Sequence, residues 1–204
     1  KQWLLPGLDP TQRAWLEVDS KAIENNARAL KQFVGKNCLL MAVVKADGYG
    51  HGAETVARAA LLGGADNLGV ATLQEGIELR KSGLNCSILL LGNLTNVNEL
   101  NACFHWELVP TLSSIREALL CQNIAKGSGK KFKVQLKVDT GMIRLGCDLG
   151  DALGLFNAIN SLDNLLLKGI YSHLALADGD LHGEAQITTS LQHQRFQTFL
   201  KSLP

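Results

Sequence analysis

The fold is decided by residues 41–52, Met41-Ala42-Val43-Val44-Lys45-Ala46-Asp47-Gly48-Tyr49-Gly50-His51-Gly52. The apolar start predicts a strand that is buried on both faces, as is typical of a parallel sheet. Lys45 stands at the carboxyl end of this strand, where open α/β sheets and α/β barrels place their chemistry. An amine in apolar surroundings can bond covalently to an aldehyde, and Tyr49 can bind a phosphate through its hydroxyl. The alternative is a lysine that reaches into solvent, beside glycines that only shape a turn.

The composition indicates a globular chain without a charge bias. The chain has 204 residues, 46% of them apolar and 19% charged, and its net charge is +1. This length suffices for one domain with a substantial core, or for two small domains at most. The near-neutral charge gives no support for nucleic-acid binding. Apolar runs stay well short of the roughly 20 residues of a membrane helix, so we expect no membrane partner.

Cysteine usage indicates a reducing compartment. The chain has five cysteines, which are widely spaced and form no CxxC pair: Cys38, Cys86, Cys103, Cys121 and Cys147. Neither a zinc site nor a disulfide framework is therefore expected. Several of the cysteines lie in apolar segments, as buried free thiols do. Because the amino-terminal residues also lack the apolar core of a signal peptide, we expect a cytoplasmic protein.

Strand and helix signals alternate along the chain. We expect strands at 14–18, 39–44, 68–71, 87–91, 107–110, 133–138 and 165–173. We expect helices from residue 19 or 20 to 34 and at 53–62, 96–104, 151–159 and 184–200, with two more opened by the capping boxes Thr72–Glu75 and Ser114–Glu117. Seven such units imply a parallel sheet with right-handed crossovers. A doubly wound sheet and a (β/α)8 barrel both fit, although a barrel typically takes about 250 residues for eight units.

Two further strand ends carry candidate site residues. The segment Val134-Gln135-Leu136-Lys137-Val138-Asp139-Thr140-Gly141-Met142-Ile143-Arg144-Leu145-Gly146 brings Lys137, Asp139 and Arg144 to the carboxyl rim. The planar fork of an arginine can hold a phenolate or carboxylate. The segment Gly169-Ile170-Tyr171-Ser172-His173-Leu174-Ala175-Leu176-Ala177-Asp178 ends a strand at His173. The alternatives are an ordinary Lys–Asp pair and a structural histidine.

All three segments resemble, in the same order, the motifs of bacterial alanine racemases. Residues 43–52 resemble the family's pyridoxal-phosphate attachment signature, with Gly48 where the family usually has alanine. Residues 134–146 resemble its LKVDTGMxRLG segment, and residues 169–178 its YSHxAxAD segment. The resemblance implies that residues 1–204 are the amino-terminal domain that binds this cofactor. It implies an incomplete (β/α)8 barrel of the TIM type, without the eighth unit and without the family's carboxyl-terminal β domain.

The resemblance also assigns roles within the site. The cofactor would be pyridoxal 5'-phosphate, attached covalently to Lys45, which also serves as a base on one face of the substrate. Tyr49 would bind the phosphate, Arg144 would bind the ring oxygen, and His173 would pack against the ring. Lys137 aligns with a lysine that is commonly carbamylated and that orients the arginine. Such a carbamate is an anion, which a buried arginine requires as a partner.

The function implied is interconversion of L-alanine and D-alanine by two bases, in a homodimeric parent that supplies D-alanine for peptidoglycan. The family's second base, a tyrosine of the partner subunit's carboxyl-terminal domain, is not in this chain. We therefore expect this piece to be inactive, or nearly so, by itself. The alternatives are a serine or broad-spectrum amino-acid racemase, a non-catalytic barrel that binds pyridoxal phosphate, and a split-gene product that binds nothing.

Two other polar segments carry no site. Gly127-Ser128-Gly129-Lys130 lacks the first glycine of a phosphate-binding loop, because Ile124 stands in its place, and Lys131 replaces the required Ser or Thr. Residues 178–184 lack the ligand number and register of an EF-hand. We expect polar loops at both places and no metal site.

Overall fold

The computed structural model describes residues 16–180 and 182–204. Seven strands are present in these residues: β1 (Met41–Val43), β2 (Asn67–Val70), β3 (Ser87–Asn93), β4 (Val109–Leu112), β5 (Phe132–Asp139), β6 (Cys147–Asp148) and β7 (Leu165–Tyr171). The helices are α1 (Ser20–Val34), α2 (Lys45–Tyr49), α3 (Ala53–Leu62), α4 (Leu73–Lys81), α5 (Val97–His105), α6 (Ile115–Ala125), α7 (Leu149–Asn160) and α8 (Glu184–Lys201). The α/β alternation predicted from the sequence is confirmed.

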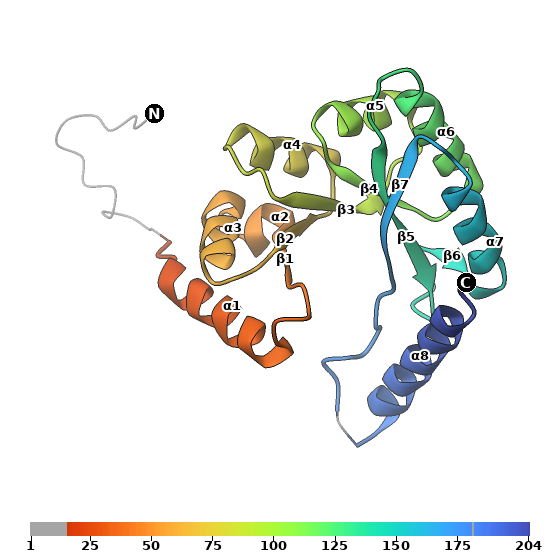
Figure 1. The fold of residues 1–204 in the computed structure, drawn as a ribbon. Coiled ribbons are helices and arrows are strands. Elements are labelled where there is room, and N and C mark those ends of the chain that lie inside the picture. The colour runs from red at the N-terminus through yellow and green to blue at the C-terminus, as the bar shows by residue number, and fades with distance from the viewer. Residues whose placement is uncertain (1–15, 181) are drawn as a thin grey trace.

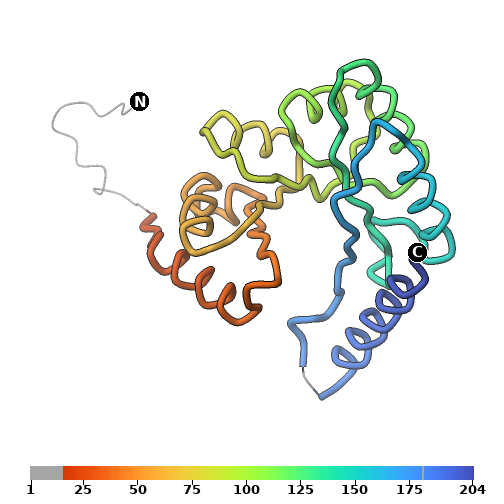
Figure 2. The backbone as a smooth tube through the Cα atoms, viewed as in Figure 1, coloured from red at the N-terminus to blue at the C-terminus, as the bar shows by residue number. Residues whose placement is uncertain are grey.

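The strands form one curved parallel sheet. Strands β1 to β5 are paired in chain order, and β5 also pairs with β7 and, at its carboxyl end, with the short β6. The helices surround the strands in an arc that runs from α1 to α8 (Figures 1 and 2). Because every pair is parallel, all strands end at the same rim, and the residues that follow β1, β5 and β7 meet there. The arrangement is that of a TIM-type barrel that is not closed by the described residues.

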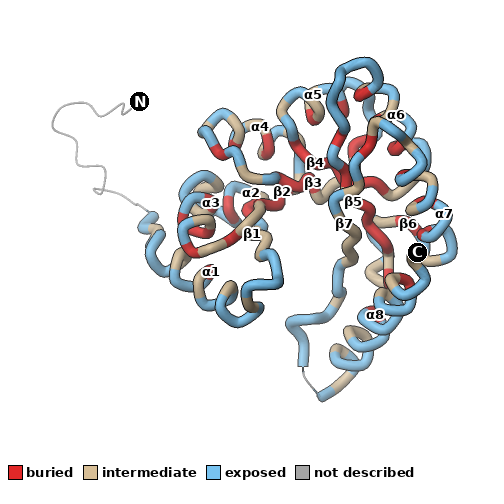
Figure 3. Tube along the Cα trace, in the orientation of Figure 1, coloured by how far each residue is buried: buried red, intermediate tan, exposed pale blue. Residues whose placement is uncertain are grey.

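The core lies between the sheet and the helices (Figure 3). Alternate side chains of the strands face outward and are fully buried, among them Leu68, Ile88, Leu90, Leu112 and Leu136. Helices α4 to α6 contribute the buried residues Leu79, Leu100, Cys103 and Ala118 to the same cluster. Each fully buried leucine or isoleucine contributes roughly 1.5–3 kcal/mol, so this layer dominates the stability of the domain.

Two reciprocal capping boxes begin α4 and α6, as predicted. Thr72 accepts the N–H of Glu75, whose carboxylate accepts the N–H of Thr72 in return. Ser114 and Glu117 form the same pair at α6. Each box satisfies backbone donors that have no partner inside the helix, which fixes the residue at which the helix begins.

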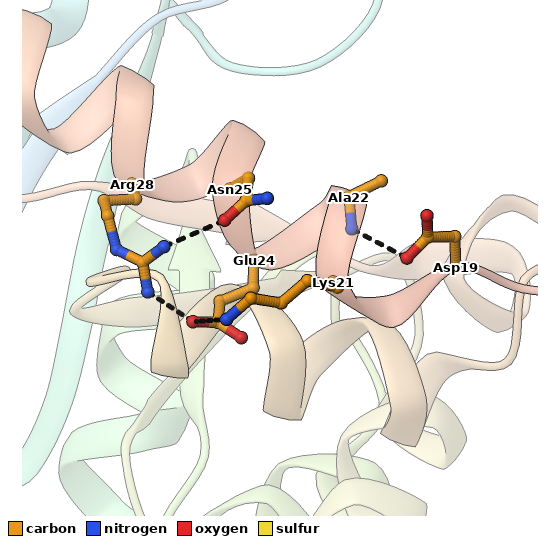
Figure 4. A network of polar contacts seen from close by, with 6 residues as sticks. All are labelled: Asp19, Lys21, Ala22, Glu24, Asn25 and Arg28. Atoms are coloured by element: carbon orange, nitrogen blue, oxygen red, sulfur yellow. Dashed lines mark hydrogen bonds and ion pairs between the residues drawn. The ribbon is translucent and has the colours of Figure 1, made fainter.

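Helix α1 lies on the outside and packs against α3. The Asp19 side chain accepts the N–H of Ala22 at 2.9 Å and caps the helix (Figure 4). Glu24 binds both Lys21 and Arg28, one turn before and one turn after it, and the bond from Lys21 and then that from Arg28 lower the pKa of this carboxyl. Such exposed pairs support the helix only weakly. No helix within the described part of the chain has the length and apolar character needed to cross a membrane.

The strand predicted at 14–18 was wrong where the structure describes it, and several others differ at their ends. The strand predicted at 39–44 is Met41–Val43, and the one predicted at 165–173 ends at Tyr171, two residues before His173. Residues 16–18 of the strand predicted at 14–18 form no strand, and residues 14 and 15 lie outside the described residues. The strand predicted at 107–110 begins at Val109 instead. The N–H groups of Glu107 and Leu108 bind Phe104 and Cys103, so these two residues complete the end of α5. The two-residue β6 was not predicted, because a pair of residues carries no periodicity.

Candidate active site at the carboxyl rim of the sheet

The turn after β1 is left-handed. Ala46, Asp47, Gly48 and Tyr49 have φ values of 52°, 53°, 62° and 56°, and the N–H of Gly50 binds the carbonyl of Ala46. A left-handed conformation costs about 1–2 kcal/mol for each residue that has a Cβ. Strain of this kind persists only where the surroundings hold it, and it is concentrated at functional sites. Here it directly follows Lys45.

Two carboxylates and one close contact hold this turn. Glu75 Oε1 accepts the N–H of Ala46 at 2.7 Å, and Asp47 Oδ1 accepts the N–H of Ala53 at 2.7 Å. Gly48 is buried, and a Cβ on it would lie 2.9 Å from Cγ2 of Val56. The glycine at 48 therefore suits this particular packing against α3. The sequence predicts Glu75 only as a helix cap. It does not show that the second carboxylate oxygen reaches the turn that follows Lys45.

Lys45 is half-buried and lies beside Tyr49. The Lys45 ammonium is 5.9 Å from the centroid of the Tyr49 ring, and 60% of the tyrosine surface is exposed. The amine and the phenol therefore lie on the same side of the turn, where both can reach one ligand. This geometry is compatible with the predicted roles of Lys45 and Tyr49, in which both side chains bind the same ligand.

Lys137 is buried, with 5% of its surface exposed. Its ammonium lies 5.6 Å from the Tyr171 ring centroid, and within residues 16–180 and 182–204 it forms no ion pair. Burial, followed by the charge of Arg144, lowers the pKa of Lys137, while the nearby Asp139 opposes this effect. Asp139 instead accepts the N–H of Gly141 at 2.8 Å. The arrangement differs from an ordinary Lys–Asp pair, and it makes Lys137 easier to deprotonate than an exposed lysine.

Arg144 lies in the exposed loop between β5 and β6. This loop turns back sharply, because β6 pairs with the end of β5. At Gly146, which has a φ of 122°, a Cβ would lie 2.8 Å from the backbone nitrogen of Asp139. The close return keeps Arg144 near the rim, where its charge acts on both Lys137 and His173.

His173 follows β7 on the same rim. Partial desolvation lowers the pKa of its imidazole, and the charges of Arg144, Lys137 and Lys45 lower it further, in that order. Its carbonyl oxygen accepts a hydrogen bond at 3.0 Å from Gln192, a buried residue of α8. Gln192 was not singled out in the sequence. Helical spacing can indicate that it faces inward, but not what it binds.

The structure thus brings Lys45, Lys137, Arg144 and His173 together, and the nearby Asp139 acts on Lys137 alone among them. Such an excess of positive charge is costly unless an anion binds there. A primary amine, a phenol, a guanidinium and an imidazole also match an aldehyde that carries a phosphate and a phenolic oxygen. Pyridoxal phosphate fits this donor set. The described residues contain no cluster of three or more His, Cys, Asp or Glu side chains that could share a metal ion.

Comparison with known proteins gives consistent matches. A family model described as "Alanine racemase, N-terminal domain" matches residues 18–204. An alanine racemase of Prochlorococcus marinus is 60% identical over 196 residues, which are 96% of this chain and 51% of that protein. The chain spans about half the length of the curated relatives it matches.

Solved structures show the same fold. The alanine racemase from E. faecalis matches with a TM-score of 0.84 and 33% identity, over 92% of this chain and 50% of that one. The histidine racemase from Leuconostoc mesenteroides subsp. sake matches with a TM-score of 0.80 and 25% identity, over 91% of this chain and 48% of that one. Two proteins with different named substrates thus share this fold.

Proposed function

The chain belongs to the alanine racemase family, and on this premise we propose that its longer parent interconverts L-alanine and D-alanine. The observation that carries the proposal is the meeting of Lys45, on its strained turn, with Arg144, Lys137 and His173. We assign residues 1–204 to the amino-terminal, cofactor-binding domain of that parent. The cofactor is pyridoxal 5'-phosphate.

Four side chains hold the cofactor in this proposal. Lys45 binds it covalently through Nζ, and Tyr49 binds its phosphate. Arg144 donates hydrogen bonds to its ring oxygen, and His173 packs against its ring. When bound, pyridoxal phosphate acts as an electron sink that makes the α-proton of an amino acid acidic.

Proton transfer at the α-carbon is the task of Lys45 and one further group. Inversion needs one base on each face of the substrate, and each must be within hydrogen-bond reach. Lys45 serves on one face. Tyr171 is poorly suited to the other, because burial raises the pKa of its hydroxyl, which is bound to Thr111 Oγ1 at 2.7 Å. We therefore assign the second base to a part of the parent outside this chain, in the partner subunit of a homodimer. Residues 1–204 are then inactive, or nearly so, by themselves.

Lys137 is proposed to carry a carbamate. An uncharged amine attacks carbon dioxide, forms an N–C bond and releases a proton, which leaves an anionic carbamate. Burial and the charge of Arg144 lower the pKa of Lys137 and so favour the uncharged amine. The carbamate would give Lys137 a negative charge in place of a positive one, and its oxygens can accept hydrogen bonds from Arg144.

The biological setting is proposed with the activity. D-alanine made by the parent enters peptidoglycan, and free thiols such as Cys103 and Cys121 suit the reducing cytoplasm. One observation favours a second candidate substrate. The match to a histidine racemase indicates that this domain is compatible with a different side chain, so a broad-spectrum racemase is the alternative function.

Two measurements test the proposal. Pyridoxal 5'-phosphate is titrated into the chain, the lysine-bound cofactor is followed by its visible absorbance, and the attachment is then made permanent by borohydride reduction. We expect attachment to be abolished by Lys45→Ala and retained in Lys21→Ala, which changes an exposed lysine of α1. An unchanged spectrum in Lys45→Ala would refute the assignment of Lys45. Interconversion rates of alanine, serine and histidine by the parent then decide the substrate, and a normal racemase rate from residues 1–204 would contradict the proposed inactivity.

A further inference from the structure

Gln192 is a polar residue that is almost completely buried within an otherwise largely exposed helix. Only 1% of its surface is exposed, while its neighbours Leu191 and His193 are exposed. Burial of a carboxamide without partners costs several kcal/mol in an apolar setting, so its hydrogen bonds decide whether it is tolerated. A leucine of similar size would pack at this position without that requirement. Its partners therefore explain what the glutamine does.

The carboxamide of Gln192 binds two loops at once. Nε2 donates to Thr140 Oγ1 at 3.2 Å and to the His173 carbonyl at 3.0 Å, and Oε1 accepts the N–H of Ala175 at 2.8 Å. A carbonyl and an N–H two residues apart are the groups that a neighbouring strand would bind. The glutamine thus replaces a strand partner just beyond the end of β7, and also contacts the residue that follows β5.

Other contacts join the same elements. Thr140 Oγ1 lies 2.8 Å from Ser172 Oγ, and Arg195 of α8 donates to the Thr140 carbonyl at 3.0 Å. Gly141 has a φ of 137°, and a Cβ there would lie 3.1 Å from Arg195 Nη1. The glycine permits α8 to approach the loop closely. The loops after β5 and β7 are therefore bound both to each other and to α8.

We propose that Gln192 is a positioning residue for the cofactor site: its carboxamide holds the backbone of residues 173–175 against the loop that leads from Thr140 to Arg144. His173 and Arg144 then remain on the rim that Lys45 occupies. This inference rests on the proposed function of that rim. It differs from a purely structural role, in which loss of the carboxamide lowers stability but leaves the surroundings of His173 unchanged.

The test compares Gln192→Leu with Gln197→Leu in the full 204-residue chain. Gln197 lies on the exposed side of the same helix, and its amide contacts only His193 among the described side chains. The imidazole of His173 is titrated by NMR, with its signal identified by its loss in His173→Gln. The affinity for pyridoxal 5'-phosphate and the melting temperature are measured for each variant.

We expect Gln192→Leu to melt cooperatively while the His173 pKa rises toward its ordinary value, because the loop becomes better solvated and moves away from Arg144, Lys137 and Lys45. Affinity for pyridoxal 5'-phosphate should fall about ten-fold, the scale of one lost buried hydrogen bond. Gln197→Leu should change neither quantity. An unchanged His173 pKa in a folded Gln192→Leu variant would overturn the proposal.

Two further measurements keep the test decisive. If Gln192→Leu does not fold, Thr140→Val removes the shared hydroxyl with little change of shape, and the same His173 criterion applies. If the unmodified chain binds no pyridoxal phosphate, the proposed function fails, but the His173 titration and the hydrogen exchange of the Ala175 amide still measure the effect of Gln192. Faster exchange of that amide in Gln192→Leu than in Gln197→Leu supports the positioning role, and equal exchange refutes it.

Discussion

Glu75 Oε1 accepts a hydrogen bond of 2.7 Å from the backbone N–H of Ala46, which joins the start of α4 to the residue next to Lys45. Its other oxygen, Oε2, accepts the N–H groups of Ala71 and Thr72. Glu117 is the equivalent residue of α6, but its Oε1 binds the Asn93 side chain instead. One carboxylate therefore both caps a helix and supports the strained lysine turn, while the other caps without touching that turn.

The two glutamates make a matched pair of substitutions. Glu75→Gln should lower the free energy of unfolding by about 1–3 kcal/mol, because charge-assisted bonds to three N–H groups are weakened. It should also weaken pyridoxal 5'-phosphate binding, since the lysine turn loses an acceptor. Glu117→Gln should lower stability without weakening cofactor binding. Urea denaturation and cofactor titration measure both effects, and equal losses of affinity in the two variants would contradict the distinction.

Within the left-handed turn at 46–49, Gly48 is the residue at which an added side chain should be least tolerated. Gly48→Ala should destabilise the chain by about 2 kcal/mol, through the left-handed φ of 62° and the contact of the new Cβ with Val56. Val56→Ala should relieve part of that cost. In urea denaturation, the double variant should therefore lose less stability than the two single variants together. Strict additivity would show that the contact with Val56 does not matter.

The helices and most strands could be predicted from local signals. The capping boxes at Thr72 and Ser114 place the starts of α4 and α6, and the alanine-rich segment 53–62 coincides with α3. Strand β4 was predicted two residues too early, because the polar Glu107 and the apolar Leu108 alternate as in a strand. In the structure, both residues finish α5 through their N–H groups. Such hydrogen bonds depend on the geometry of the helix end rather than on residue type.

The residues of the proposed site could be named from the sequence, but the contacts that support them could not. Motifs at three strand ends indicate Lys45, Arg144 and His173, and a parallel sheet necessarily brings those ends to one rim. The left-handed turn could not be predicted, because Ala46 and Tyr49 normally avoid positive φ, and aspartate visits it as a single residue rather than within a run. The contacts that support the rim come from side chains distant in sequence, such as Glu75 and Gln192. Sequence periodicity shows only which residues face inward, not what they bind.

The cysteines should divide into reactive and protected thiols. Cys38 is exposed, whereas burial raises the pKa of Cys121 to about 12 and that of Cys147 to about 11. Thiolate is the reactive form, so these two thiols and Cys103, which is buried as well, should resist Ellman's reagent at pH 8 until the chain unfolds. Rapid labelling of the native chain should disappear in Cys38→Ser. Rapid native labelling of Cys121 would contradict the described core.

Lys137 should make stability depend on pH. Its pKa is lowered in the folded chain, so between that value and the ordinary lysine pKa of about 10.4 the unfolded chain binds more protons. The free energy of unfolding contributed by Lys137 therefore rises with pH through this window and is smallest below it. Lys137→Met should stabilise the chain at pH 7, by about 1 kcal/mol, because a buried cation without a partner is removed. Lys137→Met should also reduce the rise of the free energy of unfolding with pH.

The control is Lys133→Met, which changes an exposed lysine of the same strand. Urea denaturation in carbon dioxide-free buffer from pH 7 to pH 10 measures the unmodified chain and both variants. Equal pH profiles for the two variants would show that Lys137 is not desolvated.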